Sequence, residues 1–334
     1  MPVTLADIAE RADVSLSTVS RVLNNKAHVS IPTRTAVLEA IATLGYTRQD
    51  ARREENVDTV LLLIHESIVE RMTDSAMAQY MERMIVAGAQ DTLRSVGIHT
   101  LLAHQQLGRT RSFDLPRVSN LAGAINIGSI CNPLFLRKLI SDGVKVVRAG
   151  SQDPNLMLDS VSLDFQSGYM QIVNHLVERG HRTIAMMHGP VDTAANATRF
   201  KAFRLALALH DLPYAPEQVI SAHFNFFSGD EQTRALIAAC PAIDAIIYGD
   251  DDMAVGGMRA LRAMGRKVPD DIAVVGMFNY EIGTFTDPQL TTIDFDKYET
   301  GRSAAQRLLM RLEGIEGPPW TVTLPTQLIV RDSS

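Results

Sequence analysis

The sequence predicts two folds in succession, a small all-α helix-turn-helix unit and then a larger α/β unit of two lobes. Residues 3–25 contain two short amphipathic helices with a tight turn between them. From Val57 onward, short apolar runs alternate with amphipathic helices, which is typical of parallel sheets covered on both faces. The 334 residues, 46% of them hydrophobic, are sufficient for several cores.

The first helix has a defined start. Thr4 and Asp7 resemble a capping box, and Ile8, Ala9 and Ala12 then fall on one face at helical spacing. These signals predict a short helix with one buried side.

The second helix begins after a break at residues 13–14, with Ser15 as its N-cap. Its apolar face comprises Val19, Val22 and Leu23. The outward residues are Leu16, Ser17, Ser20 and Arg21. Polar residues at this place suit a helix whose first turn lies in the DNA major groove. The alternative is a generic helix pair, in which Ser15 and Ser17 only cap.

A third helix over residues 33–44, opened by Pro32 and ended by Gly45, completes the small core. The charged segment that follows has almost no apolar residue and is predicted to be a linker, helical or not. We therefore expect three parts. They are a helix-turn-helix domain over 1–46, a hinge over 47–57 and a bilobed domain over 58–334.

The bilobed domain contains too many strand–helix repeats for one ordinary sheet. The predicted strands include residues 59–64, 99–103, 123–127, 144–147, 183–187, 245–248 and 272–275. We expect lobe 1 over 58–161 and 291–318, and lobe 2 over 162–290 and 319–334. A ligand cleft is expected between the lobes, at the carboxyl ends of the strands.

Charge is distributed unevenly along the chain. Residues 1–53 carry seven basic and five acidic residues, net +2, whereas the whole chain is net −6. The basic end is the one expected to contact DNA, and its modest charge favours two copies acting together, hence a homodimer.

Other classes of protein are disfavoured. No apolar run reaches membrane-spanning length, and Asp7 and Glu10 lie where a secretion signal needs apolar residues, so we expect a cytoplasmic protein without a membrane partner. Cys131 and Cys240 lack metal-ligand spacing. No cofactor or nucleophile motif occurs and the histidines are dispersed, so neither an enzyme nor a cofactor or metal is expected. A transport-type solute-binding protein is a competing hypothesis.

The residues of the first two helices carry a specific resemblance. The pattern Thr-Leu-x-Asp-Ile-Ala-x-x-Ala-x-Val-Ser-x-x-Thr-Val-Ser-Arg-Val-Leu-Asn, from Thr4 to Asn24, is similar to the opening of lactose/galactose-repressor (LacI/GalR) family regulators. Five further blocks resemble the same family, at residues 177–190, 198–207, 250–256, 268–276 and 288–293. The resemblance implies lobes like those of periplasmic sugar-binding proteins. It also implies a homodimeric transcription regulator, of repressor type, on a palindromic operator.

By this resemblance, Leu16, Ser17 and Arg21 take the base-reading positions. Thr4, Ser15, Thr18 and Ser20 are the candidates for phosphate contacts. Leu16 can instead be a packed core residue. In a groove it can touch a thymine methyl but offers no hydrogen bond, so specificity would depend on Ser17 and Arg21.

The linker departs from the family pattern. Arg48 replaces the usual Pro, and Glu54 and Glu55 fall where the family has a Leu that wedges between base steps. A carboxylate beside phosphates would be repelled. We therefore expect no leucine-style intercalation, and phosphate contacts from Arg48, Arg52 and Arg53 instead.

In the cleft, Arg199 matches the family guanidinium that binds effector oxygens; the alternative is an Arg on a solvated helix face. Phe224 matches an aromatic that lies against the ligand ring, and its alternative is a core role, which Phe226 and Phe227 beside it favour. Asp250 replaces an Asn, and one of the acids at 250–252 is expected to be a helix N-cap. Four hydrogen-bonding positions of the family are occupied by Gly150, Ala195, Phe278 and Phe295. These changes predict a less polar or anionic effector.

A modified sugar or sugar acid is the first candidate for that effector. A small aromatic or organic acid is the second, and the absence of any ligand is the third. The ligand would change the angle between the lobes and so the spacing of the two DNA-binding heads. The sequence leaves open whether it releases DNA or promotes binding.

Overall fold

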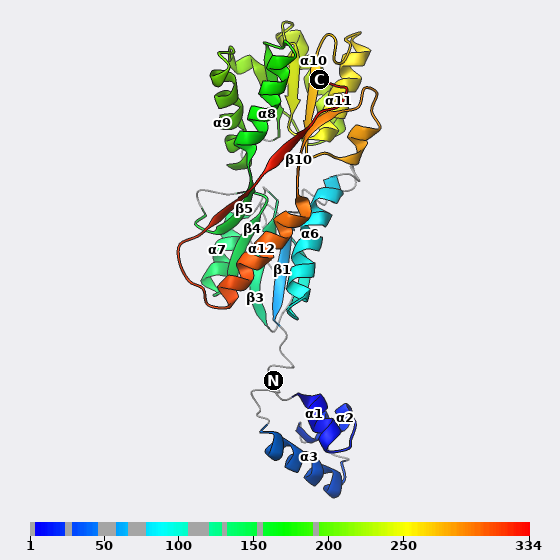
Figure 1. Ribbon diagram of the computed structural model, residues 1–334, viewed down its shortest axis with the longest axis vertical. Coiled ribbons are helices and arrows are strands. Elements are labelled where there is room, and N and C mark those ends of the chain that lie inside the picture. The colour runs from blue at the N-terminus through cyan, green and yellow to red at the C-terminus, as the bar shows by residue number, and fades with distance from the viewer. Residues whose placement is uncertain are drawn as a thin grey trace. The chain divides into compact units, whose positions relative to one another are not determined.

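The computed structural model describes residues 4–23, 29–45, 58–65, 78–105, 120–128, 132–151, 156–189 and 194–334 (Figure 1). The chain divides into two compact units. The first is Met1–Thr59 with Pro116–Asn120, and the second comprises Val60–Leu115 and Leu121–Ser334. No helix in the described ranges is both long and apolar enough to cross a membrane.

The amino-terminal unit contains α1 (Leu5–Arg11), α2 (Leu16–Leu23) and α3 (Ile31–Leu44). The predicted capping box at Thr4 is present: its hydroxyl accepts from the Asp7 amide, and the Asp7 carboxylate accepts from the Thr4 amide at 2.8 Å. Gly45, in the left-handed region at φ 68°, ends α3. The three helices enclose one small core, made by Ile8, Ala9, Val19, Val22, Val37 and Ala40.

The second unit contains two six-stranded sheets. The first has the order β11 (Thr321–Leu324), β5 (Asp159–Leu163), β4 (Lys145–Ala149), β3 (Leu121–Ile127), β1 (Thr59–His65), β2 (His99–Gln105). The second has the order β12 (Thr326–Ile329), β10 (Thr291–Phe295), β9 (Ala273–Met277), β8 (Ala245–Tyr248), β6 (Ile184–His188), β7 (Val219–Ser221). Strand β12 runs antiparallel to β10, while β9 runs parallel to β10 on its other side.

Helices cover both faces of each sheet, as the continuous apolar strands predict. On one face of the first sheet lie α6 (Ala78–Arg94) and α12 (Lys297–Leu312), and on the other lies α7 (Pro133–Ser141). Val60 and Leu62 of β1 point into the first of these cores, and Leu61 and Leu63 into the second. The second sheet is covered by α8 (Phe165–Glu178), α9 (Ala194–Leu209), α10 (Phe226–Ala239) and α11 (Asp251–Ala263).

The chain passes from one lobe to the other a few residues away from the predicted lobe boundaries. Strand β10 at 291–295 belongs to the second sheet, not to lobe 1, and β11 at 321–324 belongs to the first sheet, not to lobe 2. Only Pro325 separates β11 from β12, so the red segment in Figure 1 contributes a strand to each lobe. Apolar patterning predicts that a segment is a strand, but its sheet depends on distant partners.

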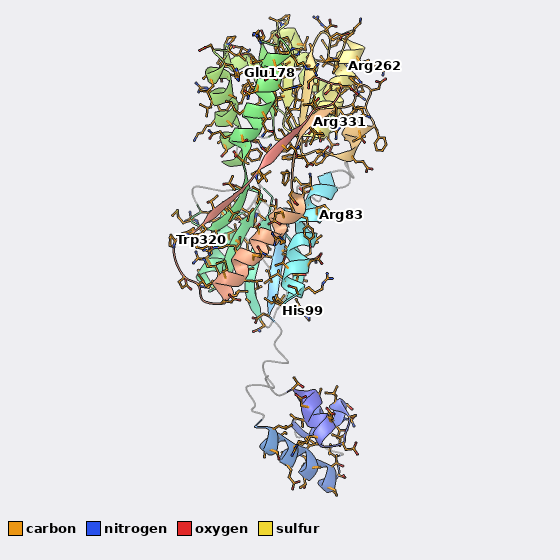
Figure 2. All side chains as sticks on the ribbon, in the orientation of Figure 1. Arg83, His99, Glu178, Arg262, Trp320 and Arg331 are labelled. Atoms are coloured by element: carbon orange, nitrogen blue, oxygen red, sulfur yellow. The ribbon has the colours of Figure 1, made fainter. Side chains whose placement is uncertain are left out.

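A buried ion cluster in lobe 1 joins β5 to α12 and to the segment that leads into β11. The Asp159 carboxylate, 4% exposed, lies 2.9 Å from Arg307 Nε and 2.6 Å from Arg311 Nε, and it accepts from the Trp320 amide at 2.7 Å. The Arg307 guanidinium carbon lies 3.8 Å from the centre of the Trp320 ring. Figure 2 labels Trp320 just before the start of β11, on lobe 1.

Candidate nucleic-acid interface and ligand cavity

Helix α2 buries its apolar side in the small core and exposes its opposite face. Leu16 is 55% exposed, which excludes the alternative that it is a packed core residue. Ser17 and Arg21 are also exposed. All three predicted base-reading side chains are therefore accessible in the amino-terminal unit.

Hydroxyl groups cluster at the start of α2. The Ser15 hydroxyl hydrogen-bonds with Ser17 Oγ at 2.8 Å and Thr18 Oγ1 at 2.9 Å, and it accepts from the Thr18 amide at 3.3 Å. Hydroxyl protons rotate freely, so this exposed cluster can redirect donors toward a phosphate near the positive end of the helix.

Of the other residues predicted to contact DNA, only Thr4 has a described side chain. The Thr4 hydroxyl donates to Asp7 Oδ2 at 2.8 Å, so its proton serves the start of α1. Ser20 lies within α2, and its side chain is outside the described part. The predictions for Arg48, Arg52 and Arg53, and for the linker acids, also lie outside the described residues.

A cavity of about 70 Å³ lies between the two lobes of the second unit. Lobe 1 lines it with Met81, Glu82, Ile85, Gly128, Gly150 and, at the end of β5, Leu163. Lobe 2 lines it with Phe165, Arg199, Phe224, Asp250, Phe278, Tyr280 and Phe295. The structure thus places all five predicted effector residues on the lobe 2 wall of the cavity, and the predicted Gly150 on its lobe 1 wall. Ala195 is buried in α9 and is not among the lining residues.

Most of these residues lie at or just after the carboxyl ends of strands. Gly128 follows β3, Gly150 follows β4, and Phe278 follows β9. This is the edge at which open α/β sheets bind ligands, because loops leave the strands there.

Arg199 lies buried among aromatic rings. Its guanidinium carbon is 4.6 Å from the ring centre of Phe165, 5.0 Å from that of Phe278 and 6.0 Å from that of Phe224. One nitrogen donates to the Gly249 carbonyl at 3.3 Å, and Nε has no hydrogen-bond partner. No carboxylate of the described residues lies within ion-pair distance of this side chain, which is 5% exposed. Burial lowers the pKa of Arg199.

The three acids that begin α11 have separate roles. Asp250 is the one of these acids that forms the N-cap, and it accepts from the Met253 amide at 2.8 Å. Asp251 is fully buried and accepts from Thr292 Oγ1 at 2.7 Å and from the Tyr280 amide. Burial raises the pKa of Asp251 well above its usual value, against these two hydrogen bonds. Asp250 therefore lines the cavity, while Asp251 stabilises the turn that leads into Tyr280.

That turn carries two cavity residues and has an unusual backbone. Phe278 has φ 92° and Asn279 has φ 50°, where side chains are rare and the cost is about 1–3 kcal/mol each. Hydrogen bonds compensate: the Phe278 amide donates to the Ile293 carbonyl at 2.7 Å, and Arg331 donates to Asn279 Oδ1 at 2.6 Å. The turn thereby holds the Phe278 and Tyr280 rings against the cavity.

Sequence reasoning missed Glu82, Phe165 and Tyr280. Glu82 is 5% exposed on α6, between the cavity residues Met81 and Ile85. An acid among apolar residues of an amphipathic helix was the available signal. The pKa of Tyr280 is raised well above its usual value by burial and by the nearby carboxylates of Asp250 and Glu82, among others.

Comparisons with known proteins agree along the chain. Residues 4–49 match the model for bacterial regulatory proteins of the lacI family, and residues 173–334 match a periplasmic binding protein-like domain. The regulator CelR of Thermobifida fusca is 31% identical, over 99% of this chain and 98% of its own. The repressor CytR of Escherichia coli (strain K12) is 28% identical, over 99% and 96%.

Solved structures give the same result. A CelR–cellobiose complex superposes with TM-score 0.73 at 30% identity, covering 99% of this chain and all of that one. The lac repressor dimer bound to operator and the anti-inducer ONPF superposes with TM-score 0.72 at 26% identity, covering 100% and 99%.

Proposed function

Because the chain belongs to the LacI family of bacterial transcriptional regulators, we propose that it is a cytoplasmic repressor that binds a palindromic operator as a homodimer. A sugar or sugar derivative in the cavity between the lobes controls this binding. One observation carries the proposal: the same chain has an exposed α2 face and an interlobe cavity that encloses Arg199. Relatives with these parts are regulators, which favours this function over enzymatic activity or solute transport.

The DNA contacts divide into two groups. Ser17 and Arg21 read base edges, and the exposed Leu16 contacts a thymine methyl. Ser15, Thr18 and Ser20 bind phosphates, aided by Thr4 at the start of α1 and by Arg48, Arg52 and Arg53 of the hinge. The domain over 1–46 thus docks on DNA, the hinge over 47–57 follows the backbone without intercalation, and residues 58–334 bind the effector and the second subunit.

The cavity suits a sugar in its chemistry. Aromatic rings such as Phe224 and Phe278 pack against apolar faces, and Arg199, Asp250 and Glu82 supply hydrogen bonds to hydroxyl groups. The prediction of a weakly polar ligand was based only on the family positions at which this sequence lacks a polar side chain. Glu82 adds a hydrogen-bonding group on the opposite wall and restores the case for a polar sugar.

Selection of bound fragments from random duplex DNA tests the DNA role with the purified full-length chain. We expect enrichment of an inverted repeat, because two copies related by a two-fold axis read two half-sites. Cellobiose and ribose are then titrated into the complex, with the operator affinity as the readout. Failure to enrich any sequence over bulk competitor DNA contradicts the proposal.

A further inference from the structure

The lobe 1 wall of the cavity has a single polar side chain among its described residues. Met81, Ile85 and Leu163 are apolar, and Gly128 and Gly150 offer only backbone. Glu82 therefore supplies the side-chain chemistry by which lobe 1 can recognise a ligand. It is 5% exposed, so little solvent reaches it.

The position of Glu82 is fixed by the core of lobe 1. Helix α6 packs beside α12 on the first sheet, and Ile85, Ala89 and Leu93 of this helix are buried in the same cluster as α12 residues. Glu82 therefore moves with lobe 1 as a rigid part. Arg199 and Asp250 move with lobe 2, because they lie on α9 and at the start of α11.

The acidic and basic side chains of the cavity favour particular ligands. Among the described lining residues, Glu82 and Asp250 are acids and Arg199 is a base. An ionised carboxylate only accepts hydrogen bonds. An added carboxylate on the ligand would face two acidic side chains, whereas a hydroxyl or ammonium group can donate to them.

We infer that Glu82 binds the effector from lobe 1 by accepting a hydrogen bond from a hydroxyl or ammonium group, while Arg199 and Asp250 hold the effector from lobe 2. This inference rests on the proposed function and deepens it in two ways. The effector is a neutral sugar or an amino sugar rather than a sugar acid. Glu82 also couples ligand binding to lobe closure, because a donor that reaches both walls favours the closed state over the open one.

Calorimetric titration of the full-length dimer tests this with five probes: cellobiose, ribose, glucose, glucosamine and glucuronate. Glu82→Gln is nearly isosteric and removes the charge, and Glu82→Asp keeps the charge but shortens the side chain. Asp91→Asn is the matched control, because it removes one exposed carboxylate from the same helix. Figure 2 labels Arg83 on this helix, and Arg83→Gln provides a second exposed control.

We expect wild-type protein to bind one of the four non-acidic probes and to bind it more tightly than glucuronate. Both Glu82 variants should weaken that binding by about tenfold to a hundredfold, as for loss of a hydrogen bond to a charged group. The probe's effect on operator affinity should shrink in parallel. Operator binding without the probe shows that each variant is folded. The control variants should match wild type.

The outcomes separate the two proposals. Unchanged probe affinity in both Glu82 variants, or tighter binding of glucuronate than of the other probes, overturns this inference and leaves the proposed function standing. Binding of none of the five probes to wild type overturns the sugar assignment in the proposed function, and this inference with it. A preference for glucosamine over glucose that disappears in Glu82→Gln identifies ammonium as the donor.

Discussion

The Phe278 ring centre lies 5.0 Å from the Arg199 guanidinium carbon, at a position where the family resemblance leads one to expect an acid. Arg199 thus makes a cation–π contact with Phe278 at this wall of the cavity. The rings stabilise the guanidinium, and no carboxylate of the described residues forms an ion pair with it, so a ligand can use its hydrogen-bonding edge.

Replacement of Arg199 by Lys should lower the affinity for the sugar probe that binds wild type by about tenfold or more, because Lys lacks the planar fork and stacks less well. Calorimetric titration measures the change. Arg204→Lys is the control, since Arg204 lies on the same helix over the Phe200 and Tyr214 rings and outside the cavity. Equal losses in the two variants would indicate a general effect on α9.

A methyl group at Gly189 should close the cavity. An added Cβ there would overlap the Phe224 ring, whereas one at Gly249 would lie 3.2 Å from it. Gly189→Ala should therefore displace the ring and weaken probe binding by about tenfold, through overpacking of about 1–3 kcal/mol. Gly249→Ala should have a smaller effect. If Gly189→Ala binds the probe as wild type does, Phe224 is not a wall of the ligand site.

Replacement of Arg21 by Ala should weaken binding to the selected operator by about 1–3 kcal/mol. Fluorescence anisotropy with the selected operator and with a scrambled duplex distinguishes the two kinds of contact. A base contact loses discrimination between the duplexes, and a phosphate contact weakens both alike. Arg94→Ala, an exposed arginine of the second unit, serves as the control. Unchanged operator affinity would place Arg21 outside the interface.

Asp159→Asn should lower the free energy of unfolding by about 3–5 kcal/mol, because it leaves the largely buried Arg307 and Arg311 without their carboxylate. Burial by itself would raise the pKa of Asp159, but hydrogen bonds from Arg311, the Trp320 amide and Arg307 outweigh it, so the pKa is lowered. Urea unfolding at pH 7 measures the loss.

The same pair of proteins gives a pH test. A lowered carboxyl pKa adds stability that is complete well above the ordinary value of 3.8 and is lost as the pH falls through the folded-state value. The stability difference between wild type and Asp159→Asn should therefore narrow below about pH 4. If the difference in the free energy of unfolding between the two proteins stays constant down to pH 3, the ionised Asp159 carboxylate is not its source.

Local signals predicted much of this molecule. The capping box at Thr4, the apolar face of α2 and the buried run of β1 each depend on residues close in sequence, and each forms as expected. Strand β5 was missed because Asp159, Ser160 and Ser162 make it look like a loop. It is a strand because Arg307 and Arg311, about 150 residues away, neutralise the acid inside the fold.

The sequence by itself determined the order of the two folds and the exposed residues of α2, and its resemblance to the LacI family indicated Arg199 and Phe278 as members of one candidate site. Periodicity and capping act over a few residues, so they can be recognised without coordinates. The tertiary structure decided which lobe each late strand joins and that Glu82 lines the same cavity as Arg199 and Asp250. The pairing of β11 with β5 and the placement of Glu82 beside the same cavity as Arg199 join segments more than a hundred residues apart, which no local pattern encodes.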